Sequence, residues 1–158
     1  MAELPSQSSK TPLTDSERLE RRSQIAALEA HMLAMPAEEQ VGIAGMTSHI
    51  FGGGVYCRRM DIPAGVVVVG KIHKTEHISI LLSGSVQITT EEGTSEPLHA
   101  PQIVVAQPGT KRIAKALTDC TWLALHAVGA ERDLAKIEAQ FIAPSFEALE
   151  AEQRREIA

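Results

Sequence analysis

Short apolar segments separated by turn residues fill the middle of the chain, and this pattern constrains the fold more than any other feature. The segments are rich in Val, Ile, Leu and Ala, and turn residues such as Pro63-Ala64-Gly65 and Pro108-Gly109 stand between them. The clearest of these strand segments are 55–62, 66–69, 78–82, 84–90, 95–99, 102–106, 112–117 and 121–128. Eight or nine short strands at near-regular spacing predict an all-β antiparallel barrel or sandwich, extending over about residues 40–128.

A helical pattern precedes the strands. Thr14 and Glu17 are placed as in a capping box, and apolar residues follow at helical spacing until Pro36. We therefore expect an N-terminal amphipathic helix within residues 14–36, packed on a sheet or against a second copy of itself. Residues 1–13 are rich in Ser, Thr, Pro and Lys, and we expect them to be flexible.

The chain returns to a helical pattern after the strands. Leu134, Ile137 and Phe141 lie on one helical face, and Ser145 is placed to cap a second helix. We expect residues 131–158 to form a C-terminal helical segment whose charged end is solvated or contacts another subunit.

Composition and charge exclude several classes of protein. A length of 158 residues favours one domain, and a net charge of −5 gives no support for nucleic-acid binding. No apolar stretch is long enough to cross a membrane. The first residues also lack the apolar core of a signal peptide, so a cytoplasmic location is expected.

Two histidines four residues apart are the strongest candidates for chemistry. His73 and His77 lie where one predicted strand turns into the next, between Gly70 and Gly84. Imidazoles held close together by such a turn are common metal ligands. The alternative is that each histidine is a surface residue or a hydrogen-bonded core residue.

This segment and the later Pro-Gly turn resemble the two sequence motifs of the cupin superfamily over about residues 50–128. Aligning the last glycine of the first motif with Gly84 puts the motif's glutamate position on His77, its second histidine on His73 and its first on Lys71. The histidine position of the second motif falls on Arg112. The resemblance implies a single cupin β-barrel that forms a homodimer. An edge strand within residues 55–69 and the outer helices would be natural pairing surfaces.

A third histidine can supply the ligand that is missing from the second motif, where Arg112 stands at the histidine position. If Thr118-Asp119 joins segments 112–117 and 121–128 in a hairpin, His126 lies opposite Lys111 and next to Arg112. A triad of His73, His77 and His126 with one or more open positions would suit divalent Zn, Ni, Fe or Mn.

The Gly-Lys-Ile-His-Lys-Thr-Glu-His string at residues 70–77 looks closer to the small cupins encoded by tailed bacteriophages. That resemblance extends over about residues 20–150 and includes both helical regions. It implies a protein of the infected bacterial cytoplasm, or a virion component that contacts phage structural proteins, and it implies no established reaction.

Charged residues near the histidines are compatible with either a metal or an anion as the ligand. Lys71, Lys111 and Arg112 oppose a metal by repulsion but favour an anion, which Arg112 could hold through two hydrogen bonds. Glu76 could act as an acid/base or orient an imidazole, or could be a solvated turn residue. A metal with an anionic ligand satisfies these residues, and an anion alone satisfies them nearly as well.

Two functions are compatible with this site. The first is a metal- or anion-binding module, such as a virion or assembly component. The second is a metalloenzyme, such as a dioxygenase, isomerase or lyase, that acts on a small anionic substrate. A histidine at position 77, where a cupin site usually keeps a carboxylate, favours the first.

Overall fold

Two antiparallel sheets form the body of the protein in a computed structural model that describes residues 12–40 and 42–157. The five-stranded sheet has the order β1 (Thr47–Gly52), β2 (Val55–Ile62), β11 (Cys120–Ala127), β5 (His77–Ser83) and β9 (Gln102–Ala106). The second sheet has the order β3 (Val67–Val69), β10 (Ile113–Ala116), β6 (Ser85–Thr90) and β7 (Gly93–Thr94), with β8 (Leu98–His99) also paired to β6. A third pair joins β4 (Ile72–His73) to β12 (Ile142–Ala143).

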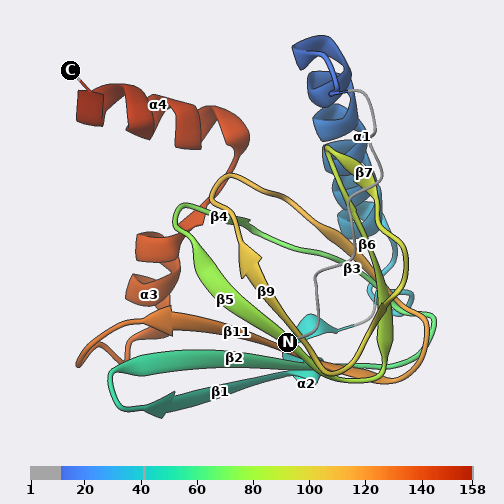
Figure 1. Cartoon of the computed structure of the whole chain (residues 1–158), viewed down its shortest axis with the longest axis vertical. Coiled ribbons are helices and arrows are strands. Elements are labelled where there is room, and N and C mark those ends of the chain that lie inside the picture. Colours follow the sequence, from blue (N-terminus) through green and yellow to red (C-terminus); the bar gives the residue numbers. More distant parts are fainter. Residues whose placement is uncertain (1–11, 41, 158) are drawn as a thin grey trace, which may run out of the picture.

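The two sheets face each other around a shared core, with helices outside them (Figure 1). One core cluster takes residues from both sheets: Met60, Ile62, Leu81 and Cys120 from the first, and Val68, Val86 and Ala116 from the second. Side chains alternate between core and solvent along each strand, so the apolar positions of consecutive strands meet between the sheets. This arrangement confirms the predicted fold class, an all-β barrel or sandwich with flanking helices.

One predicted strand pairing is wrong. Residues 112–117 and 121–128 do not form a hairpin, because β10 pairs with β3 and β6 whereas β11 pairs with β2 and β5. The turn after β10 carries the chain from one sheet to the other. His126 therefore lies opposite Tyr56 of β2 and not opposite Lys111.

The predicted edge strand is also only partly correct. β2 is an inner strand because β1 pairs with one side of it, from Thr47 opposite Met60 to Gly52 opposite Val55, and β11 pairs with the other side. The sequence pattern predicts neither β1 nor the short strands β4, β7 and β12. β3 does lie at the edge of its sheet.

Gly84 joins β5 to β6 at a position that only glycine can occupy. Its φ is +78°, and a Cβ built there would lie 2.1 Å from the Asp119 carbonyl oxygen. The close approach of this backbone to the neighbouring strand explains why a glycine is required at the end of the histidine segment.

Helix α1 (Asp15–Ala34) confirms the predicted N-terminal helix and its capping box. The Thr14 hydroxyl accepts a hydrogen bond from the Glu17 N–H at 3.2 Å, and the Thr14 N–H donates to the Glu17 carboxylate at 2.7 Å. Ile25 is the buried residue of this helix, whereas Leu19 and Leu33 are exposed. The predicted flexible segment falls largely on residues 1–11, which lie outside the described residues.

Helices α3 (Leu134–Phe141) and α4 (Phe146–Ile157) confirm the helical C-terminal segment, and a short helix, α2 (Ile43–Met46), precedes β1. α3 packs against the five-stranded sheet through Ile137 and Phe141, which cluster with Tyr56. The Ser145 hydroxyl accepts from the Ala148 N–H at 3.1 Å, as expected of a cap. In Figure 1, α1 and α4 stand out from the same end of the sheets. No helix in the described ranges is long and apolar enough to cross a membrane.

Candidate metal and anion site

Three histidine rings converge at one end of the space between the sheets. The ring centroids of His73 and His77 lie 4.1 Å apart, those of His77 and His126 4.7 Å, and those of His73 and His126 5.1 Å. The potential ligand atoms of the three residues all lie within 4.8 Å of one another. The structure thus brings together the three positions that the sequence analysis grouped, although by a different strand pairing.

Strand register explains why His77 and His126 meet. The β5–β11 ladder pairs Ile78 with Leu125, so His77 and His126 continue the same register one residue further. Adjacent side chains on one face of an antiparallel pair lie about 5 Å apart. Both histidines are buried, because they point to the inner face of the sheet.

His73 reaches the site from a separate short pair of strands. It lies opposite Ile142 in the β4–β12 pair, and its carbonyl accepts a hydrogen bond from the Gly109 N–H at 2.9 Å. Phe141, next to Ile142, lies with its ring centroid 4.8 Å from that of His126. The C-terminal segment therefore helps to position two of the three histidines.

The surroundings keep the three imidazoles neutral. Burial, with smaller contributions from nearby positive charges, lowers the pKa of His73 to about 3 and that of His126 to about 4. Burial also lowers the pKa of His77. Neutral imidazoles retain the lone pair that a metal ion needs, so no proton has to be displaced at pH 7.

The three histidines fit a divalent metal ion. The Nδ1 atoms of His73, His77 and His126 are all buried and have no hydrogen-bond partner among the described residues. Nitrogen ligands of one zinc ion lie about 3.4 Å apart, since each bond is about 2.1 Å long, so a shift of about 1 Å would complete the site. Three nitrogen donors would hold the ion and leave at least one position open.

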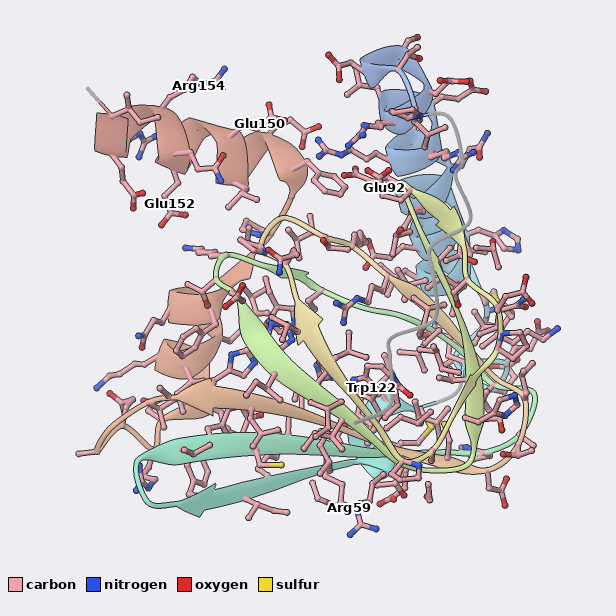
Figure 2. All side chains as sticks on the ribbon, in the orientation of Figure 1. Arg59, Glu92, Trp122, Glu150, Glu152 and Arg154 are labelled. Atoms are coloured by element: carbon pink, nitrogen blue, oxygen red, sulfur yellow. The ribbon has the colours of Figure 1, made fainter. Side chains whose placement is uncertain are left out.

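Two adjoining cavities lie beside the histidines. The first has a volume of about 100 Å³ and lies between the sheets, where His73 and His77 share its wall with apolar residues such as Trp122. Figure 2 shows Trp122 in the space between the two sheets. The second has a volume of about 450 Å³ and is bounded by residues of β2 and α3 together with His73 and His126.

The four charged residues predicted to bind a ligand have different surroundings. Arg112 lines the first cavity, and Lys71 lines both, but the Lys71 ammonium forms an ion pair with Glu138 of α3. Lys111 does not line either cavity: it is buried against α1, with its Nζ 2.7 Å from the Glu29 carboxylate. Glu76 is exposed and accepts a hydrogen bond from Gln107 at 3.2 Å, outside both cavity walls.

A group of cavity residues on β1 and β2 is not among the residues predicted from the sequence. Arg58 lines both cavities. His49 and Tyr56 line the second, and the His49 Nδ1 lies 2.8 Å from the Tyr56 hydroxyl. Alternation along β2 could have revealed Arg58, because Tyr56, Met60 and Ile62 on the same face are all buried. An arginine in an otherwise inward-facing series indicates a polar interior.

Comparison with other proteins gives a partial structural likeness. The sequence matches no protein-family model, and no curated protein matches it. A cupin-2 domain protein from Shewanella frigidimarina is 15% identical over 51% of this chain and 78% of its own, with a TM-score of 0.42.

Two further solved structures give similar values. KdgF from Halomonas sp. is 18% identical over 55% of this chain and 81% of its own, with a TM-score of 0.45. A predicted oxalate decarboxylase from Thermotoga maritima is 18% identical over 52% and 78%, with a TM-score of 0.44. The likeness to these three structures extends over 51% to 55% of this chain.

Proposed function

We propose that this protein is a cupin-like module whose three histidines bind one divalent metal ion, Zn, Ni, Fe or Mn, next to an anionic ligand held by Arg112. The convergence of three neutral imidazoles, whose buried Nδ1 atoms have no partner among the described residues, carries the proposal. Hydrogen-bonded core histidines would have their polar atoms satisfied, because an unpaired buried polar group destabilises a fold.

An anionic ligand accounts for Arg112. Its side chain is half-buried, and burial lowers its pKa, yet no carboxylate of the described residues lies within 4.0 Å of it. A carboxylate ligand bound to the metal would place negative charge where the histidines and Arg112 meet. It would therefore offset the repulsion between the ion and the guanidinium.

Elemental analysis of the purified protein tests the metal. We expect close to one equivalent of a divalent metal in the wild type and less than a tenth in His73→Ala/His77→Ala. His99→Ala is the matched control, since His99 is exposed and lies on β8 against Ser85. Absence of metal in the wild type, even after incubation with each of the four ions, would contradict the proposal and leave an anion pocket.

A binding or assembly role fits the ligand set better than catalysis. The three grouped ligands include no carboxylate, and Glu76 points towards Gln107 at the surface. On this proposal the protein acts in the bacterial cytoplasm or in a virion, as its resemblance to phage-encoded cupins implies. A gene placed among head and tail genes would support it, and one among metabolic genes would favour the enzyme.

We also propose that two copies pair through the outer face of the five-stranded sheet. One row of side chains crosses all five strands in register: Ile50, Cys57, Leu125, Ile78 and Val105. The charged residues of β2 on this face, Arg59 and Asp61, form an ion pair with each other, so two copies would not repel. An apolar, electrically neutral sheet face is suited to a second copy of itself.

A further inference from the structure

Two arginines without carboxylate partners lie beside the three histidines. Arg58 is on β2, and Arg112 precedes β10. Neither forms a side-chain hydrogen bond or an ion pair with any residue that the structure describes. Other half-buried arginines have partners, as in the pairs of Arg22 with Glu91 and of Arg59 with Asp61.

The two arginines belong to opposite sheets, since Arg58 is on β2 of the five-stranded sheet and Arg112 directly precedes β10 of the second sheet. Both arginines line the first cavity, but only Arg58 also lines the second. His73 lines both cavities, whereas His77 lines only the first and His126 only the second. Arg58 therefore shares a cavity with each of the three histidines, and Arg112 shares one with His73 and His77.

An unpaired, half-buried guanidinium is costly, because its charge loses water without gaining a partner. Lys71 offers no alternative cation for a ligand, since Glu138 already neutralises it. A ligand with one carboxylate could pair with only one of the two arginines. Two separate anionic groups would satisfy both.

The first cavity, which both arginines line, indicates what connects those two groups. The wall of the first cavity is largely apolar and includes Met60, Val68 and Trp122. A short hydrocarbon chain would contact these side chains without leaving a polar group unpaired. Each arginine offers one guanidinium, whose fork matches the two oxygens of a carboxylate.

We infer that the ligand of this site is a small aliphatic dicarboxylate, with one carboxylate on Arg112 and the other on Arg58. This inference rests on the proposed function in so far as one carboxylate also contacts the metal. The pairing with two arginines, however, can be measured whether or not a metal is present.

Calorimetric titration of the purified full-length protein tests the inference. The probes are malonate, succinate and glutarate, each compared with the monocarboxylate of the same chain length: propionate, butyrate and pentanoate. We expect at least one dicarboxylate to bind tenfold or more tightly than its monocarboxylate. In Arg58→Gln the ratio of the dicarboxylate affinity to the monocarboxylate affinity should fall below three. The affinity for the monocarboxylate should stay within twofold of the wild-type value.

Arg59→Gln is the matched control, because Arg59 is the next residue and points away from the sheets (Figure 2). It should leave the ratio unchanged. If Arg58→Gln does not fold, Arg58→Lys keeps the charge but not the fork, and should reduce the ratio severalfold.

Equal affinity for both kinds of acid, a ratio unaffected by either Arg58 variant, or tighter binding of inorganic phosphate would each overturn the inference. Metal analysis of the same samples separates it from the proposed function. Stoichiometric metal without a dicarboxylate preference would defeat the inference alone. A preference without metal would support the inference and defeat the metal proposal.

Discussion

The two faces of the five-stranded sheet have opposite chemistry. The inner face, which would ordinarily be entirely apolar, carries His77, Ser79 and His126, with Arg58 two strands from His77. The outer face exposes Ile78, and with it Ile103, a residue that is 69% exposed. Polar residues inside and apolar residues outside indicate that each face contacts something besides water and core.

The alternation of side chains along each strand provides pairs of residues that test this comparison. Arg58 and Arg59, His77 and Ile78, and Leu81 and Leu82 are consecutive residues that point to opposite faces. The chain thus supplies its own matched controls, since each pair shares the same backbone environment. What differs within a pair is the surface that the side chain contacts.

The largest effect on the free energy of unfolding is expected at Leu81, where the inner face of the five-stranded sheet is part of the hydrophobic core. Leu81→Ala should lower the free energy of unfolding by about 3 kcal/mol, because Leu81 is fully buried and its truncation leaves a cavity. Leu82→Ala, at a residue that is 51% exposed, should lower it by less than about 1 kcal/mol. Urea denaturation measures both. Similar losses for the two variants would show that the faces are not distinct.

Acid should destabilise the histidine end of the inner face. The folded-state pKa values of His73 and His126, about 3 and about 4, lie below the ordinary value of 6.5, so the unfolded chain takes up protons first as pH falls. Metal-free protein should lose about 2 kcal/mol of unfolding free energy between pH 7 and pH 5, allowing for partial screening by solvent. Denaturation in EDTA at several pH values measures this loss.

The matched control for this pH dependence is His73→Leu/His126→Leu, which should lose most of it. A wild-type protein equally stable at both pH values would mean that the rings are solvated.

A charge on the outer face should separate the two proposed copies. Ile103→Glu should weaken self-association tenfold or more, because it puts two carboxylates into an apolar interface without partners. Leu19→Glu on α1, at a side chain that is 61% exposed, should not change association. Sedimentation at several concentrations gives the oligomeric state. A monomeric wild type, or association unchanged by Ile103→Glu, would refute this pairing.

The smallest effect is expected at Ser79, between the core and the site. Its hydroxyl is fully buried and has no hydrogen-bond partner among the described residues. Ser79→Ala should change the unfolding free energy by less than about 0.5 kcal/mol, or increase it, because an unpaired polar atom is removed. Thermal denaturation measures this change. A loss above about 1 kcal/mol would show that the hydroxyl has a partner, such as a bound water.

Much of the secondary structure could be predicted from the sequence because its determinants are local. The capping box at Thr14, the strand spanning 55–62 and the glycine at position 84 each depend on residues a few positions apart. β4 and β12 could not be predicted in this way. Each has two residues, and each exists only because the other lies beside it.

The candidate site shows the same division between local and distant determinants. His73 and His77 lie close together because they are only four residues apart in the sequence. The predicted hairpin that places His126 beside them does not form. His126 nevertheless lies beside His77, because its strand, β11, pairs with β5, and β5 begins at His77. Lys111 was placed at the site for its position in the sequence, but Glu29, which is 82 residues away, pairs with it instead.

The sequence by itself determined where most of the strands and the longer helices form, which turns need glycine, and that two imidazoles lie close together. The tertiary structure decided which strands pair, that Arg58 faces the histidines, and that the C-terminal segment supports His73. The physical reason is that backbone preferences and caps act within a few residues. Strand pairing, in contrast, is chosen by the burial of side chains that are distant along the chain.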